Sequence, residues 1–123
     1  MEFDTTQPIY KQIMEDFKKK MIRGELKTGD KILSQREYAW HATINPNTVQ
    51  RAYREMENIQ LVETLRGQGT FVSVSEQMLD DIKREMARKL LNTFIYEMKS
   101  LGFSSDEICK MITGQIKEGN NND

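Results

Sequence analysis

The stretch that decides the fold is residues 34–74, SQREYAWHATINPNTVQRAYREMENIQLVETLRGQGTFVSV. Its first half contains two signals for the start of a helix. Ser34 followed by Glu37 has the S-x-x-E spacing of a capping box, which predicts a helix from Ser34 to about Ala42. Asn45 stands directly before Pro46, so a capping side chain precedes a proline at the first helical position. This pair predicts a second helix that ends near residue 58.

The second helix is predicted to be amphipathic. Apolar residues recur at i, i+3, i+4 and i+7, which places them on one helical face, and they are Val49, Ala52, Tyr53 and Met56. The opposite face carries side chains that can hydrogen-bond to bases and phosphates, namely Asn47, Gln50, Arg51 and Arg54. The pattern therefore indicates a helix with one face in the core and one face able to bind nucleic acid.

Two short apolar runs follow this helix, at 61–65 and 70–74, on either side of Arg66-Gly67-Gln68-Gly69. The two glycines permit the positive φ angles of a tight hairpin. Two helices joined by a short turn and followed by such a hairpin predict a winged helix. An earlier helix is expected from Pro8 to about Arg23, because Ile9, Ile13, Phe17 and Met21 are spaced four apart and Gly24 follows.

From Ser75 onward the apolar pattern becomes helical. A stripe of apolar residues continues to Gly102, and Ser104-Ser105-Asp106-Glu107 then caps a shorter helix. Two helices cannot bury so long a stripe alone, which favours a second copy of the chain over folding of the stripe onto its own winged helix. The expected dimer interface is Leu79, Ile82, Met86, Leu90, Phe94, Met98, Leu101, Ile108, Met111 and Ile112.

The fold class is thus mainly α (α+β): an N-terminal winged helix-turn-helix with a small β-hairpin wing and a two-helix C-terminal dimerisation tail. The expected divisions are 1–74 for the winged helix, 75–118 for the tail and 119–123 for a disordered end. Trp40 is predicted to pack in a partly buried position, and Cys109 is predicted to be a small buried side chain.

Composition narrows the function mainly by exclusion. The chain has 123 residues, one cysteine, one histidine (His41) and a net charge of −1. No apolar run reaches the roughly 18 residues that cross a membrane, no signal peptide is apparent, and a cytoplasmic protein is expected. No catalytic triad, metal-ligand cluster or GxGxxG motif is found, so neither an enzyme nor a cofactor is predicted. Residues 1–74 hold eleven Lys and Arg against ten Asp and Glu, so bulk charge alone does not indicate nucleic acid.

Four runs carry a resemblance to a known family: Ser34-Gln35-Arg36-Glu37, Asn45-Pro46-Asn47-Thr48-Val49, residues 51–55 (RAYRE) and residues 66–72 (RGQGTFV). They resemble the GntR family of bacterial transcription regulators, and the run NPNTVQRAYRE in a short chain resembles its YtrA subfamily. The likeness begins at Pro8 and covers the first 74 residues. Three positions depart from the family pattern: Leu33 replaces a usual proline, Ala42 a leucine and Thr43 a glycine.

The resemblance implies which residues meet double-stranded DNA. The second helix would lie in the major groove, Arg36 would touch DNA, the wing would approach the minor groove or backbone, and a short strand at 31–33 would pair with the wing. The expected DNA-binding set is Ser34, Gln35, Arg36, Asn45, Pro46, Asn47, Thr48, Gln50, Arg51, Arg54, Arg66, Gly67, Gln68, Gly69 and Thr70. Tyr10 and Lys11 are weaker candidates for phosphate contact, and Arg54 could instead pair with an acid.

The predicted function is a homodimeric, sequence-specific transcription regulator acting on an inverted repeat; repression is favoured, but the sequence does not give the sign of regulation. The resemblance also implies control of a transporter operon. One alternative is a small-molecule effector bound between the tail helices, where Met78, Met86, Met98 and Met111 would make the interface adaptable. Another is a winged helix that binds a protein instead of DNA. No membrane partner is expected.

Overall fold

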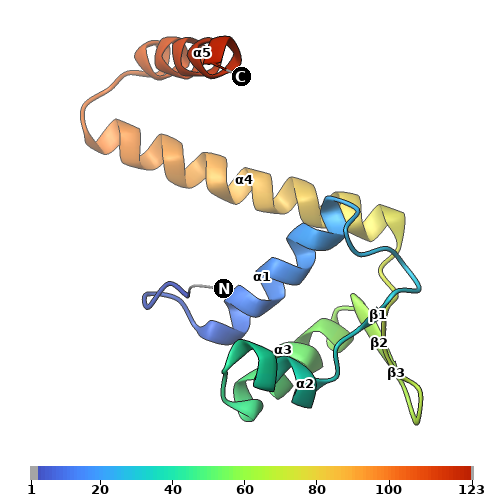
Figure 1. Cartoon of the computed structure of the whole chain (residues 1–123). Helices are drawn as coiled ribbons and strands as arrows, with labels where there is room; N and C mark the ends of the chain where they lie inside the picture. Colours follow the sequence, from blue (N-terminus) through green and yellow to red (C-terminus); the bar gives the residue numbers. More distant parts are fainter. Residues whose placement is uncertain (1–2, 123) are drawn as a thin grey trace. The chain divides into compact units, whose positions relative to one another are not determined.

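The computed structural model describes the backbone of residues 3–122 and the side chains of residues 3–119. Five helices and a small sheet make up this part of the chain (Figure 1). In chain order they are α1 (Ile9–Ile22), β1 (Lys31–Ile32), α2 (Gln35–Ala42), α3 (Pro46–Asn58), β2 (Val62–Leu65), β3 (Gly69–Val72), α4 (Glu76–Ser100) and α5 (Ser105–Asn122). The predicted fold class is confirmed. Residues Met1–Lys83 and Arg84–Asp123 form two compact units, which are described separately.

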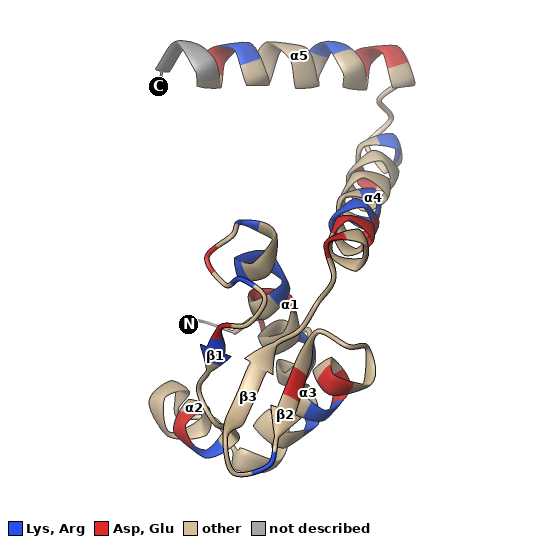
Figure 2. Cartoon of the chain, turned by 90° about the vertical axis from the view of Figure 1, so that its right-hand side faces the viewer, with Lys and Arg blue, Asp and Glu red and all other residues tan. Residues whose placement is uncertain are grey.

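The three strands form an antiparallel sheet in which β3 lies between β1 and β2 (Figure 2). Strand β1 pairs Lys31 with Phe71, and the β2–β3 hairpin closes with Leu65 opposite Gly69. The strand expected at 31–33 is therefore present, although it ends at Ile32. Gly67 and Gly69 have φ angles of 78° and 127°, the left-handed conformations that this turn needs.

The winged-helix core lies between α1, α3 and the sheet. Val49, Ala52, Tyr53 and Met56 are all fully buried, so the predicted apolar face of α3 is confirmed. Helix α1 adds four buried residues to this core, Ile13, Met14, Phe17 and Met21. Ile9, expected on the same stripe, is 41% exposed because it occupies the first turn, beyond the end of the core.

Side-chain caps start both helices of the helix-turn-helix as predicted. Ser34 Oγ accepts a hydrogen bond from the Glu37 N–H at 3.1 Å, and Asn45 Oδ1 accepts one from the Asn47 N–H at 2.8 Å. Each bond satisfies a backbone donor that the first helical turn leaves without a partner. The caps thereby fix where α2 and α3 begin.

A shared backbone motif ends α1, α2, α3 and α4. In each, two N–H groups past the helix reach back to carbonyls of the last turn, as when Ile44 donates to Ala39 and Thr43 to Trp40. The motif requires one residue in the left-handed conformation, a position that glycine usually fills. Gly24 and Gly102 fill it in α1 and α4, whereas Thr43 (φ 56°) and Gln60 (φ 65°) fill it in α2 and α3.

The first turns of α4 belong to the winged-helix unit. Met78, Leu79 and Ile82 are half-buried against its core. Leu79 and Ile82 were expected in a dimer interface, and that role stays a prediction, because each side chain is only partly covered by its own chain. The compact unit accordingly extends to Lys83, past the division predicted after residue 74.

In the second unit, most of the apolar stripe is exposed. Large apolar side chains that face solvent in the single chain are Leu90, Leu91, Phe94, Tyr96, Leu101, Met111 and Ile116, while Met86, Met98 and Ile112 are half-buried. Ile108, also expected in the dimer interface, is already buried in the single chain, and its part in a dimer stays a prediction. Cys109 is exposed, so its predicted burial is wrong; it lies next to Ile108 on α5, where successive side chains point about 100° apart.

Helix α5 starts with a complete capping box. Ser104 Oγ accepts from the Glu107 N–H at 3.2 Å, and Glu107 Oε1 accepts from the Ser104 N–H at 3.0 Å. These bonds to Ser104 lower the pKa of the Glu107 carboxyl. At its other end the helix runs to Asn122, where a disordered end was expected from residue 119; no proline follows Gly114 to interrupt it. Asp123 lies outside the described residues.

Candidate nucleic-acid interface

The exposed face of α3 carries the polar side chains that the sequence predicted for DNA contact. Asn47, Gln50 and Arg54 are exposed, and Thr48 is half-buried. Asn45 uses its side-chain oxygen to cap the helix, and Pro46 occupies the first helical position. Asn45 and Pro46 therefore set where the helix begins. The exposed side chains that follow on the outer face of α3 are available to a ligand.

Arg51 differs from its neighbours on this face because it contacts α1. Its guanidinium carbon lies 3.9 Å from the centre of the Tyr10 ring. Its Nη2 also donates a hydrogen bond of 3.3 Å to the Tyr10 hydroxyl, which is long for a bond of this type. The stack therefore lies well inside the distance range of a cation–π contact, whereas the hydrogen bond is near the long end of its range. Nothing in the spacing of the sequence indicated this pairing across 41 residues.

The start of α2 carries the second group of predicted residues. Ser34 and Arg36 are exposed and Gln35 is half-buried, with the Ser34 hydroxyl occupied by the helix cap. Because free N–H groups and the helix dipole favour an anion at a helix start, Arg36 is well placed for phosphate.

Trp40 lies one helical turn beyond Arg36, and its predicted burial is wrong. Its side chain is 79% exposed, and Ala39 is the buried residue of α2. The short helix turns one narrow face to the core, so Trp40 shares the outer side with Arg36. Both residues line an open hollow together with Ala39, Thr43, Ile44 and Pro46.

The wing presents Arg66, Gly67 and Gln68 at its exposed tip, with Gly69 half-buried. Thr70 is the exception, because its side chain is only 6% exposed and its hydroxyl lies 3.0 Å from that of Thr64. A strand alternates its side chains between faces, and Thr70 falls on the covered face. The predicted contact of Thr70 with DNA stays a prediction, and the burial of its side chain leaves mainly its backbone for such a contact.

A groove brings the wing and the start of α2 together. Its lining includes the predicted residues of both elements, 34–36 and 66–70, together with Lys31. The Lys31 side chain lies so close to Gly69 that a Cβ there would stand 2.6 Å from Lys31 Cε. Sequence reasoning missed Lys31, since only its pairing with Phe71 brings it beside the wing. The groove thus adds a third basic side chain beside Arg36 and Arg66.

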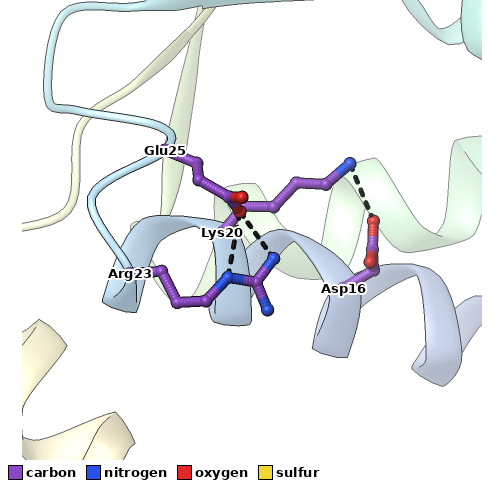
Figure 3. A network of polar contacts seen from close by, with 4 residues as sticks. All are labelled: Asp16, Lys20, Arg23 and Glu25. Carbon is purple, nitrogen blue, oxygen red and sulfur yellow. Dashed lines mark hydrogen bonds and ion pairs between the residues drawn. The ribbon is translucent and has the colours of Figure 1, made fainter. Parts of the chain in front are cut away.

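Basic side chains at the other end of α1 are engaged with acids. Lys20 lies 3.1 Å from Asp16 one turn earlier, and Arg23 lies 2.5 Å from Glu25 (Figure 3). These exposed pairs contribute little stability, but they balance the charge of Lys20 and Arg23. Lys20 and Arg23 are therefore less suited to bind phosphate than the basic side chains of the groove and of α3.

Two features are absent from the described residues. No group of three or more His, Cys, Asp or Glu side chains is arranged to hold a metal ion. Within the same residues, no helix has the length and apolar character needed to cross a membrane.

The fold and the site define a winged-helix DNA-binding protein, and comparisons with known proteins specify the family. Residues 9–72 match the model of the bacterial regulatory proteins of the gntR family. The chain is 41% identical over 111 residues to the HTH-type transcriptional regulator YhcF of Bacillus subtilis, covering 90% of this chain and 92% of that protein. It is 37% identical over 120 residues to the HTH-type transcriptional repressor YtrA of Bacillus subtilis, covering 94% and 92%.

A solved structure agrees with this result. A GntR family transcriptional regulator from Listeria monocytogenes superposes with a TM-score of 0.82 at 35% identity, covering 91% of this chain and 98% of that one. The chain belongs to the GntR family of DNA-binding transcription regulators, as the sequence motifs predicted, and the likeness to YtrA is confirmed. These relatives are regulators, which supports a role other than catalysis.

Proposed function

We propose that two copies of this chain bind an inverted repeat in bacterial DNA and repress transcription there. The observation that carries the proposal is the division of α3: one face is fully buried, and the other holds exposed Asn47, Gln50 and Arg54. A recognition helix reads base edges with side chains near its N-terminus. The name of the Bacillus subtilis relative, a transcriptional repressor, favours repression as the sign of regulation. Such a protein would act in the cytoplasm, where the bacterial chromosome lies.

The contact residues fall into two roles. Asn47 and Gln50 have amide groups that can bond adenine at two points, so we assign them to base reading. Arg36 at the start of α2 and Arg66 at the wing tip are assigned to phosphate or the narrow groove. Lys31 joins the second role because it lines the same groove. For Thr70 we assign only the backbone to phosphate contact, because its side chain is buried.

The exposed stripe of the second unit supports the homodimer. Leu90 and Leu101 are each 72% exposed in the single chain, and Phe94 between them is 40% exposed. Exposed apolar surface of this extent favours association with a partner, and a second copy places the same stripe on both sides of a two-fold axis. Half-sites read by two α3 helices would then be arranged as an inverted repeat.

The proposal is tested by selecting sites from a pool of randomised DNA duplexes with the purified full-length protein. We expect an inverted repeat to be enriched and two chains to bind each duplex. Fluorescence anisotropy then compares the selected duplex with a scrambled one over a range of salt concentrations. Selection of no common sequence would overturn the proposal, and a single repeat bound by one chain would overturn the dimer.

Two variants separate the roles of the contact residues. Arg36→Ala is expected to weaken binding to both duplexes and to lower the salt slope by about one. Asn47→Ala is expected to weaken the selected duplex by about 1–3 kcal/mol while leaving the scrambled one unchanged. Arg88→Ala, a charge paired with Glu85 outside the winged helix, is the control. Equal losses on both duplexes for both variants would contradict the assignment.

A further inference from the structure

The contact between Tyr10 and Arg51 joins α1 and α3, two helices that also share the core. Tyr10 lies in the first turn of α1, and Arg51 lies in the second turn of α3. The Arg51 guanidinium lies 3.9 Å from the centre of the Tyr10 ring, and its Nη2 bonds the hydroxyl.

The side chains of Tyr10 and Arg51 differ in conformational freedom. Tyr10 is half-buried and packs against the core cluster, so its ring is held by the fold. Arg51 is exposed and has a long side chain with several rotatable bonds. In such a contact the tyrosine determines where the guanidinium is placed. The guanidinium still has further N–H groups to offer, because only one nitrogen bonds the hydroxyl.

The buried packing between α1 and α3 argues against a purely structural role for the stack of Arg51 on Tyr10. Packing between α1 and α3 already rests on fully buried side chains, including Ile13 and Tyr53. An exposed cation–π contact adds little to that packing. What the contact does change is the cost of ordering Arg51 when a ligand binds, since a side chain already held in place loses less freedom.

We propose that Tyr10 is a positioning residue for DNA recognition, which holds the Arg51 guanidinium in place beside the reading face of α3. The inference rests on the proposed function, and it makes α1 part of the recognition surface. Arg54, one turn further on α3, carries the same side chain without such a stack among the described contacts. Arg51 and Arg54 should therefore behave differently although they share a helix.

A double-mutant cycle on the selected duplex tests the coupling. Tyr10→Leu is expected to weaken binding about 3- to 10-fold, the range for ordering one long side chain. Tyr10→Phe keeps the ring and should bind like the wild type, because the bond it removes is long. In an Arg51→Ala background, Tyr10→Leu should cause no further loss. Lys11→Ala, a neighbouring change on α1, should show no coupling to Arg51.

A second measurement needs no DNA. Relaxation of the arginine side-chain Nε–H groups by NMR should show Arg51 more rigid than Arg54 in the wild type and equally mobile in Tyr10→Leu. Circular dichroism confirms that each variant is folded. Arg51 as mobile as Arg54 in the wild type would overturn the inference, and so would an equal loss from Tyr10→Leu with and without Arg51. If the wild type selects no DNA sequence, the proposed function fails, and the relaxation data alone decide the positioning role.

Discussion

Replacing Thr43 with glycine should stabilise the protein. Thr43 ends α2 in the left-handed conformation, with φ 56° and ψ 49°, and the turn into α3 depends on it. For an L-residue this conformation costs about 1–2 kcal/mol, because Cβ approaches the following carbonyl oxygen. A β-branched side chain such as threonine is especially rare there. Glycine has no Cβ and removes this cost.

The gain in folding stability from Thr43→Gly is partly offset, because glycine also gives the unfolded chain more conformational freedom. Glycine loses more conformational freedom on folding than other residues, at a cost of roughly 0.5–1 kcal/mol. The Thr43 side chain is exposed, so little packing is lost. The net expectation for Thr43→Gly is a gain of about 0.5–1 kcal/mol, which corresponds to a rise in Tm of about 2–5 °C.

Urea denaturation at one fixed protein concentration measures this gain, since a dimer's stability depends on concentration. Thr43→Ala is the matched control: it keeps Cβ in the same conformation and should gain less than glycine. Gln60→Gly, at the corresponding position after α3, should stabilise less than Thr43→Gly because glutamine is not β-branched. A Thr43→Gly variant no more stable than Thr43→Ala would refute the reasoning.

Three further outcomes follow from the same structure. Acrylamide should quench Trp40, the sole tryptophan, readily in the free protein and less readily once DNA covers the side of α2 that also carries Arg36. Gly69→Ala should destabilise the protein more than Gly67→Ala in urea, because φ 127° at Gly69 lies farther from the left-handed region open to L-residues than φ 78° at Gly67. The pKa of the Tyr53 hydroxyl is raised, chiefly by burial and to a smaller extent by the nearby Tyr38 and Glu37. Its neutral form is favoured in the fold, so stability should be intact below about pH 10 and fall as the pH rises further, less steeply in Tyr53→Phe.

The features that the sequence predicted well depend on neighbouring residues. Ser34 and Asn45 cap the helices they were assigned to, and Gly102 closes α4, because caps act within three or four residues. The buried face of α3 also followed from spacing alone. Helical periodicity needs no knowledge of the partner surface, provided that the helix has one broad apolar face.

Predictions that depended on which surface covers a side chain were less accurate. Trp40 was assigned to packing, yet α2 has only eight residues and buries Ala39 instead. Leu79 was assigned to a dimer because it continues a stripe, and that role stays a prediction; the spacing did not indicate that Leu79 also packs on its own winged helix. In both cases periodicity identified a face but could not identify its neighbour.

The stack of Arg51 on Tyr10 shows the same limit at the site. Helical spacing in the sequence places Arg51 on the polar face of the second helix. In the structure Arg51 lies in α3 and is exposed, as that spacing predicts. Its orientation depends on a ring 41 residues earlier, which is near only because α1 and α3 share one core. Recognition residues can therefore be proposed from one helix, but the side chains that position them must be found in the fold. For a winged helix this extends the reading surface to α1, where a change at Tyr10 should alter DNA binding through Arg51.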